Sequence, residues 1–202
     1  NLANAGYEVY AYDVIKQKTI SAEKKGCIKK ESLKSAVKEV DFVVTMLPEG
    51  RHVKEAYLTK EGIVNNASPG TILIECSTID VETTKKVGEV ALCKDLFMID
   101  CPVSGGTSGA VNSTLTFMVG GNSETLKLSL PLLNVMGKKI LYWVLDNLNC
   151  KNIEKIIIPY NCELSKYNFE KQLIKDYNFN FEFICLKENT RGAAESIYIG
   201  LN

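Results

Sequence analysis

The sequence predicts an α/β fold built around a doubly wound parallel sheet, and two observations carry this prediction. Four strongly apolar runs recur along the first two thirds of the chain, and stretches with helical spacing lie between them. Runs that are apolar on both faces are typical of strands buried in a parallel sheet. Alternation of strand and helix at these lengths indicates right-handed βαβ units.

Each predicted strand ends where the residue type changes. The first run ends at Asp13 and the second at Pro48, while the third follows a Pro-Gly turn and the fourth precedes a Cys-Pro pair. The predicted strands are residues 8–12, 40–47, 71–76 and 96–100. Apolar residues at three- and four-residue spacing predict helices over 31–39 and from Asp80 to residue 91, the latter with acidic residues in its first turn.

Length and composition are those of an ordinary folded protein. The 202 residues are 46% apolar and 24% charged, which argues against disorder. The 24 basic and 24 acidic residues cancel, whereas nucleic acid and anionic membranes both favour a basic excess. We therefore expect no nucleic-acid and no membrane partner. The first residues lack a secretory signal, so a cytoplasmic location is expected, or an organelle matrix in a eukaryote.

The seven cysteines are scattered and form no Cys-x-x-Cys pair, and His52 is the only histidine. A secreted disulfide framework is usually denser and even in number, and a zinc site needs closely spaced ligands. We therefore expect reduced thiols packed as small apolar side chains, and no metal site.

In doubly wound sheets, ligands bind beyond the carboxyl ends of the strands. Asp13 closes the first predicted strand of this sequence. An acidic residue that closes the second strand of a dinucleotide-binding fold can accept hydrogen bonds from the adenosine ribose and repels a 2′-phosphate. The alternative for Asp13 is a simple helix N-cap. The segments Ser77-Thr78 and Ser104-Gly105-Gly106 could hold a carboxylate or phosphate through hydroxyl and backbone donors. Their alternative is ordinary turn chemistry.

Four motifs occur in order within residues 1–138. They are Thr45-Met46-Leu47-Pro48, Gly70-Thr71-x-x-Ile74-x-x-Ser77-Thr78-Ile79-Asp80, Asp100-Cys101-Pro102-Val103-Ser104-Gly105-Gly106-x-x-x-Ala110 and Leu115-Thr116-Phe117-Met118-Val119-Gly120-Gly121. Together they closely resemble the β-hydroxyacid dehydrogenases, and among these the 3-hydroxyisobutyrate dehydrogenases. The resemblance implies NAD as cofactor and oxidation of a small β-hydroxyacid, such as 3-hydroxyisobutyrate, to the semialdehyde.

The resemblance also implies roles for individual residues. Leu47 and Pro48 would line the dinucleotide site, and Thr78 would contact the cofactor near the nicotinamide. The loop Ser104-Gly105-Gly106 would bind the substrate carboxylate. His52 stands where the family commonly has Asn, so we expect it to be a surface or cap residue.

Two features of the family are absent from these 202 residues. One is the first strand with its Gly-x-Gly-x-x-Gly loop, so we expect a Rossmann-like sheet that lacks its first strand and exposes unpaired edges. The other is the helical domain that carries the family's catalytic Lys and supports its dimer. We therefore name no catalytic residue, expect the chain as given to be inactive, and expect an oligomer only where that domain is present.

The last part of the chain has a different composition. Residues 1–138 hold 12 of the 14 glycines, so we predict a domain boundary there and a separate α/β segment over 139–202. Its predicted elements are a helix at 141–148, a strand at 153–159, a helix at 168–177, a strand at 181–186 and a helix from Thr190. The segment weakly resembles the early part of a sugar nucleotidyltransferase. The alternative function is therefore a nucleotide-sugar-binding or nucleotidyltransferase-like protein.

Overall fold

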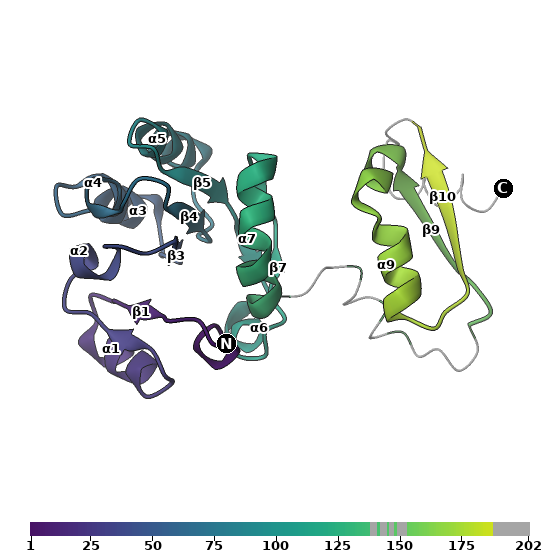
Figure 1. The fold of residues 1–202 in the computed structure, drawn as a ribbon, viewed down its shortest axis with the longest axis horizontal. Helices are drawn as coiled ribbons and strands as arrows, with labels where there is room; N and C mark the ends of the chain where they lie inside the picture. The colour runs from purple at the N-terminus through teal and green to yellow at the C-terminus, as the bar shows by residue number, and fades with distance from the viewer. Residues whose placement is uncertain (138–140, 142–144, 146–147, 149–152, 188–202) are drawn as a thin grey trace. The chain divides into compact units, whose positions relative to one another are not determined.

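The structure is a computed structural model of the 202-residue chain and describes residues 1–137, 141, 145, 148 and 153–187. It divides into two compact units, residues 1–146 and 147–202 (Figure 1). Each unit is described by itself. Among the described residues, no helix is long and apolar enough to cross a membrane.

The centre of the first unit is a four-stranded sheet of order β3-β4-β5-β8. Its strands are β3 (Phe42–Thr45), β4 (Ile72–Glu75), β5 (Phe97–Asp100) and β8 (Gly120–Gly121). The first three are parallel, with Thr45 beside Glu75 and Glu75 beside Asp100, whereas β8 is antiparallel to β5. All four residues of β4 are buried, which confirms the prediction of a parallel-dominated sheet covered on both faces.

Two smaller sheets flank this one. In the first, β1 (Tyr10–Ala11) is parallel to β2 (Ile28–Lys29), and in the second β6 (Val103–Ser104) is antiparallel to β7 (Thr116–Phe117). Within residues 1–137, β1 and β3 belong to different sheets. The strand predicted at 8–12 is therefore only two residues long in the structure, because within residues 1–137 β1 pairs with β2 alone. This agrees with a Rossmann-like sheet that lacks a strand.

The helices within residues 1–137 vary in length. They are the 3₁₀ helix η1 (Ala3–Ala5), α1 (Lys16–Glu23), α2 (Leu33–Ala36), α3 (Gly50–Leu58), α4 (Ile63–Asn66), α5 (Val81–Leu92), α6 (Gly106–Val111) and α7 (Ser123–Met136). The helix predicted from Asp80 is confirmed as α5, with the Asp80 side chain accepting a hydrogen bond from the Thr83 amide at 2.8 Å. The helix predicted over 31–39 contracts to α2, and Glu39 has a φ of 57°, which takes the chain out of the helical region.

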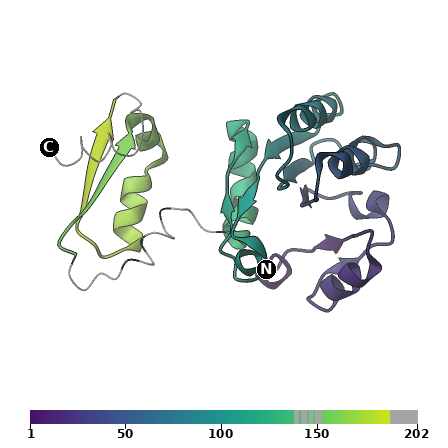
Figure 2. The same ribbon diagram turned by 180° about the vertical axis from the view of Figure 1, so that it is seen from behind.

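Apolar residues cover both faces of the sheet. Leu73 belongs to a core cluster with Val53 and Tyr57 of α3 and Val87 of α5. Residues 72 and 74 of β4 point to the other face, where Ile99 of β5 and Leu132 and Leu133 of α7 complete a second cluster. Figure 2, in which the molecule is seen from behind, shows α7 lying beside the sheet. Alternate residues of β4 therefore enter different cores, and Glu75 shares the face of Leu73.

The second unit is a parallel βαβ arrangement. Its described residues form β9 (Ile156–Asn161), the 3₁₀ helix η3 (Cys162–Tyr167), α9 (Phe169–Asp176) and β10 (Phe181–Leu186), with residue 181 beside residue 156. The strand predicted at 153–159 begins three residues later, and the helix and strand predicted at 168–177 and 181–186 are present. Most of the predicted helix at 141–148, and all of the one from Thr190, lie outside the described residues.

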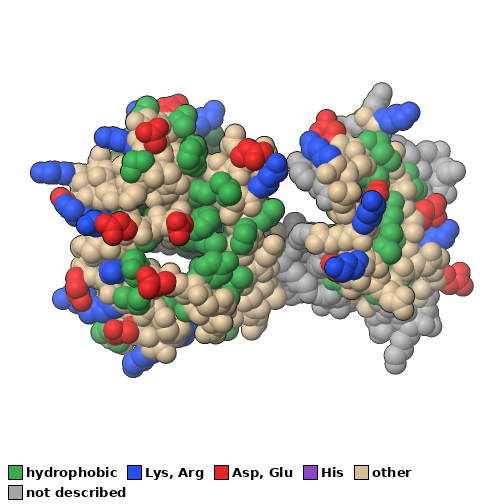
Figure 3. All heavy atoms as spheres, in the orientation of Figure 1, with side chains coloured by type: hydrophobic (Ala, Val, Ile, Leu, Met, Phe, Trp, Pro, Cys, Tyr) green, Lys and Arg blue, Asp and Glu red, His purple; other side chains and the backbone are tan. Residues whose placement is uncertain are grey.

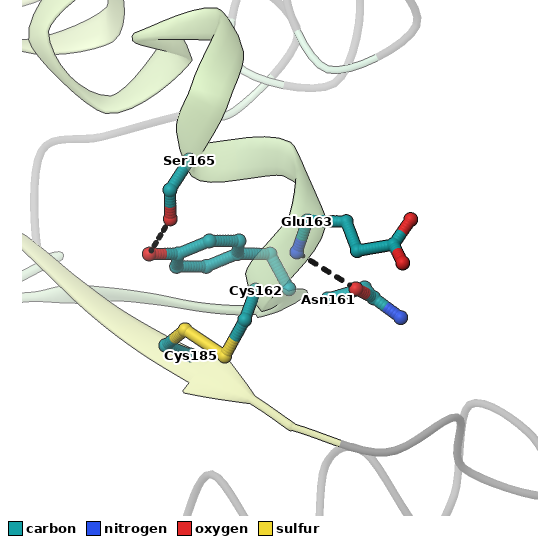
Figure 4. Close-up of a disulfide and its surroundings, with 6 residues drawn as sticks. Asn161, Cys162, Glu163, Ser165 and Cys185 are labelled. Atoms are coloured by element: carbon teal, nitrogen blue, oxygen red, sulfur yellow. Dashed lines mark hydrogen bonds between the residues drawn. A yellow bond between two sulfur atoms is a disulfide. The ribbon is translucent and has the colours of Figure 1, made fainter.

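The expectation that all seven cysteines are reduced is wrong for one pair. Cys162 and Cys185 form a disulfide between the start of η3 and β10, with Cα atoms 4.9 Å apart (Figure 4). The parallel register places residue 185 opposite Tyr160, two positions before Cys162, so the fold brings together two cysteines that lie far apart in sequence. Cys76 and Cys101 are buried free thiols, as predicted.

Candidate functional site

The candidate site is the edge of the main sheet at which β3, β4 and β5 end. Because these strands are parallel, the loops that follow them emerge at the same edge. The first loop carries Leu47 and Pro48, the second Thr78, and the third leads into β6 at Ser104. Leu47 is half-buried, whereas Pro48, Thr78 and Ser104 are exposed. The structure thus brings these four predicted site residues to one edge.

A direct bond joins the first two loops. The Leu47 amide donates to Ser77 Oγ at 2.7 Å, so the loop after β3 is attached to the loop after β4. A second close approach follows at Gly50, where a Cβ atom would lie 2.5 Å from Asp80 Oδ2 and 3.1 Å from Thr83 Oγ1. A larger residue at position 50 would therefore push the first turn of α3 away from the N-cap of α5.

Beneath these loops lies a buried polar network centred on Glu75, the last residue of β4. Glu75 Oε1 accepts hydrogen bonds from the Ser77 amide at 3.0 Å, from the Ser77 hydroxyl and from Thr45 Oγ1 at 3.3 Å. Thr45 Oγ1 also lies 2.6 Å from the hydroxyl of Tyr57 in α3. Burial raises the pKa of Glu75 above its ordinary range, although the bonds from Ser77 oppose that shift.

The third loop owes its shape to glycine. Gly105 has a φ of 123° and Gly106 one of 58°, conformations that side chains with a Cβ rarely adopt. Ser104 precedes them as the last residue of β6 and pairs with Thr116 of β7. The antiparallel pairing of β6 with β7 therefore fixes Ser104, and the two glycines turn the chain directly after it. This leaves the hydroxyl and the exposed backbone together, as binding a carboxylate would require.

Asp13 occupies a tight turn rather than a helix cap. Its Oδ1 accepts from the Ile15 amide at 2.8 Å and its Oδ2 lies 3.5 Å from the ammonium of Lys18. The N-cap of α1 is Ile15, which makes no side-chain capping bond, so the N-cap alternative is wrong. The side chain of Asp13 is 33% exposed, which leaves room for a ligand. Among the described residues, β1, which precedes Asp13, does not pair with β3 and belongs to a separate sheet.

Sequence reasoning overlooked several residues around the site. Lys18, in the first turn of α1 and five residues after Asp13, brings a cation close to that carboxylate. The ring nitrogen Nδ1 of His52 in α3 is buried and has no hydrogen-bond partner within the described part of the chain, so the expected surface or cap role does not describe it fully. The buried carboxyl of Glu75 had one signal in the sequence, a charged residue that ends an otherwise apolar strand.

The fold and the grouping of loops at the carboxyl edge define the class of dinucleotide-binding α/β domains. The comparisons agree, because residues 1–144 match the family described as the NAD binding domain of 6-phosphogluconate dehydrogenase. The chain belongs to this family, and within it to the β-hydroxyacid dehydrogenases.

The assignment to the β-hydroxyacid dehydrogenases rests on similarity to curated relatives and to a solved structure. The NAD-dependent L-serine dehydrogenase of Pseudomonas aeruginosa is 39% identical over 142 residues, which are 70% of this chain and 48% of that protein. The 3-hydroxyisobutyrate dehydrogenase of the same organism is 37% identical over the same shares. The Mycobacterium tuberculosis 3-hydroxyisobutyrate dehydrogenase structure with L-serine has a TM-score of 0.65 at 36% identity, covering 68% of this chain and 46% of that one. The chain thus spans about half the length of these relatives.

Proposed function

We propose that this chain supplies the cofactor-binding part of an NAD-dependent dehydrogenase that oxidises a small β-hydroxyacid, such as 3-hydroxyisobutyrate or serine. The observation that carries the proposal is the convergence of three loops with family motifs at one sheet edge, two of them joined by the Leu47–Ser77 bond. Relatives named for these activities and the family membership support it.

The residues at this edge fit parts of a nicotinamide dinucleotide. Leu47 and Pro48 offer an apolar surface for the nicotinamide end, and the exposed Thr78 hydroxyl offers a polar contact beside it. The half-exposed Asp13 carboxylate suits the adenosine ribose hydroxyls. The cofactor, when bound, supplies the hydride acceptor. The protein's own part here is to position the ring and to disfavour a 2′-phosphate.

The substrate proposal rests on the loop at Ser104, Gly105 and Gly106. A hydroxyl followed by two glycines with positive φ suits the carboxylate of a hydroxyacid. The proton of the substrate hydroxyl needs an acid–base group, and we assign none within residues 1–202. We also propose that the domain of this type covers residues 1–138 and that residues 139–202 form a separate α/β segment.

A chimera tests the proposed function directly. Residues 1–137 replace the matching segment of the Pseudomonas aeruginosa 3-hydroxyisobutyrate dehydrogenase, which supplies its own residues on both sides. The proposal expects NAD-dependent oxidation of 3-hydroxyisobutyrate, followed as NADH absorbance, and binding of NADH by fluorescence titration. A folded chimera that binds no NADH and turns over no hydroxyacid would contradict it.

The variant Ser104→Ala in this chimera tests the substrate loop. It removes one hydroxyl donor to a carboxylate, a charge-assisted bond worth roughly 1.5–3 kcal/mol, so kcat/KM should fall about ten- to a hundredfold. The NADH dissociation constant should stay close to that of the parent chimera. Ser108→Ala is the matched control, because Ser108 is also exposed and lies in α6, just after the loop. An equal loss in NADH binding would move Ser104 out of the substrate loop.

A further inference from the structure

Glu75 is a buried ionisable group with no part in the proposed cofactor and substrate contacts. Its side chain is 0% exposed on the sheet face that also buries Leu73. An apolar residue would suit this position in a strand covered on both faces. Burying a carboxyl group costs free energy unless hydrogen bonds compensate it. The hydrogen bonds that Glu75 accepts therefore indicate what it does.

Two chains of hydrogen bonds converge on Glu75 Oε1. In the first, the Leu47 amide donates to Ser77 Oγ at 2.7 Å, and the Ser77 hydroxyl donates to Glu75. Ser77 has one hydroxyl proton, so accepting from Leu47 leaves that proton directed at the carboxyl group. In the second, Thr45 Oγ1 donates to Glu75 at 3.3 Å and accepts from the Tyr57 hydroxyl at 2.6 Å.

Both chains of hydrogen bonds end on elements that shape the loop after β3. Thr45 is the last residue of β3, Leu47 lies two residues further on, and Tyr57 belongs to α3, which follows the loop. Glu75 and Ser77 themselves are 0% exposed, so water does not compete for these bonds. The carboxyl group thus bonds, directly or through one side chain, to the strand before the loop, to the loop and to the helix after it.

We propose that Glu75 and Ser77 are positioning residues that fix the loop at Leu47 and Pro48 in the shape that receives the dinucleotide. The importance of that shape for the cofactor rests on the proposed function, whereas the positioning itself is a property of this chain. One acceptor oxygen carries the effect. Glu75 Oε2 has no hydrogen-bond partner among the described residues, so the second oxygen adds nothing to the network that they form.

The test is amide hydrogen exchange, measured by NMR on the 202-residue chain. Ser77→Ala removes the acceptor of the Leu47 amide, and that amide should exchange about tenfold faster, as expected for the loss of one hydrogen bond. The Cys76 amide, which donates to the Thr45 carbonyl at 2.8 Å, is the internal reference. Ser129→Ala is the matched control, because Ser129 is equally buried and its hydroxyl donates within α7 to the Thr125 carbonyl.

Two substitutions of Glu75 test the carboxyl group itself. Glu75→Gln keeps the Oε1 acceptor and should keep the slow exchange of Leu47. Glu75→Leu has a similar volume without an acceptor and should accelerate that exchange as Ser77→Ala does. Where Glu75→Leu does not fold, Ser77→Ala with its Ser129→Ala control decides the matter.

Several results would overturn the inference. One is a Leu47 exchange rate in Ser77→Ala that changes no more than that of Cys76. Another is a Glu75→Gln chain whose Leu47 amide exchanges as fast as in Ser77→Ala. Failure of the proposed function is a different observation, because it would leave the chimera unable to bind NADH while the Leu47 amide still responds to Ser77→Ala.

Discussion

At the scale of single residues, the site depends on carboxylates with opposite surroundings. Asp13 is partly exposed and lies 3.5 Å from the Lys18 ammonium, so it can meet a ligand. Glu75 is buried and bonded to neutral donors, so it can organise a loop but cannot meet a ligand. Burial therefore decides which of the two carboxyl groups a ligand can reach, and we propose recognition for Asp13 and loop positioning for Glu75.

Asp13 should set the preference between NAD and NADP. In the chimera, Asp13→Ala removes the acceptor for the ribose hydroxyls and leaves the Lys18 ammonium without its partner, free to meet a 2′-phosphate. Loss of hydrogen bonds to a charged group, each worth roughly 1.5–3 kcal/mol, should weaken NAD binding at least about tenfold. NADP binding should tighten, and titration of both cofactors measures the ratio.

Asp13→Asn distinguishes the effect of the negative charge of Asp13 from that of its hydrogen bond within the turn. It keeps an oxygen that can accept from the Ile15 amide but removes the repulsion of a phosphate, so it should shift the ratio towards NADP in the same direction. A parent chimera that binds NADP more tightly than NAD would refute the NAD assignment.

Glu75 should also make stability depend on pH. Burial, with a contribution from Asp100 on β5, raises its pKa above the ordinary value of 4.5. The folded state therefore holds this proton more tightly than the unfolded chain, so the stabilising contribution is fully present below the ordinary pKa. It is lost as pH rises through the raised pKa. Glu75→Gln cannot ionise and should lack this loss.

Thermal unfolding of both chains from below pH 4.5 up to neutrality measures the effect. The stability of the native chain relative to Glu75→Gln should be greatest at the acid end and decline as pH rises. The other ionisable groups that raise the pKa of Glu75 or contact its network, Asp100 and Tyr57, are unchanged in both chains. Two unfolding curves that run parallel across this range would show that Glu75 keeps an ordinary pKa.

The sequence predicted the polar residues at strand ends better than their partners. Thr78 and Ser104 follow the apolar runs of β4 and β5, and the parallel pairing of these strands brings their ends to one edge. Asp13 follows β1, which belongs to a separate sheet. The Leu47–Ser77 bond and the Lys18–Asp13 pair join residues across loops. The spacing of apolar residues along the sequence does not predict such contacts. The role of Glu75 depends on where Tyr57 packs, which only the folded chain determines.

At the scale of elements, the long apolar runs were predicted best and the short connecting elements worst. β3, β4 and β5 pair in parallel. The central strand β4 is buried along its whole length, whereas β3 and β5 each bury one residue fully, so the apolar composition of β4 is a direct consequence of its surroundings. Strands of two residues, such as β6 and β8, form only because each pairs with a neighbouring strand. Their own residues therefore carry little signal. The Cys162–Cys185 disulfide was missed for a similar reason, since the register of β9 and β10 creates it.

That disulfide should stabilise the second unit alone. It closes a loop with a sequence separation of 23 residues, and the chain-entropy estimate for such a loop is roughly 3 kcal/mol. Reduction, or Cys185→Ser, should lower the unfolding temperature of residues 153–187 and leave that of the first unit unchanged. Peptide mapping without reductant should recover the linked Cys162 and Cys185 peptides. Cys93→Ser, at an exposed free thiol of the first unit, should change neither transition. Free thiols at both positions would contradict the bond.

At the scale of the whole molecule, the surface chemistry agrees with a small-molecule function. The 24 basic and 24 acidic residues give no net charge, and Figure 3 shows both signs interspersed on the visible face of the first unit rather than one basic patch. The visible face of the first unit therefore presents no extended basic region. The exposed polar groups at the carboxyl edge, Thr78 and Ser104 among them, are therefore the chemistry that a ligand would meet.

The 202-residue chain by itself should bind NAD weakly and turn over no β-hydroxyacid. Its sequence contains no Gly-x-Gly-x-x-Gly loop, so the pyrophosphate lacks the backbone donors and helix N-terminus that such a loop provides. It also lacks the family's Gly-x-x-x-Lys-x-x-x-Asn helix, and a general acid–base group typically contributes about 10²–10⁴-fold in rate. The measurement is NADH absorbance with 3-hydroxyisobutyrate and related hydroxyacids, with the chimera as positive control.

A flat trace from the chain beside an active chimera is the expected result. Turnover above the buffer background would mean that another residue performs the acid–base step, and the lysines of the second unit are the first to test. Among these, Lys155 donates to Glu182 at 2.7 Å, so its ammonium would have to leave that ion pair before it could act on a substrate. Lys155→Ala would then abolish the activity if Lys155 were responsible, whereas Lys127→Ala, which removes a comparable exposed ion pair with Glu124 in the first unit, would leave it intact.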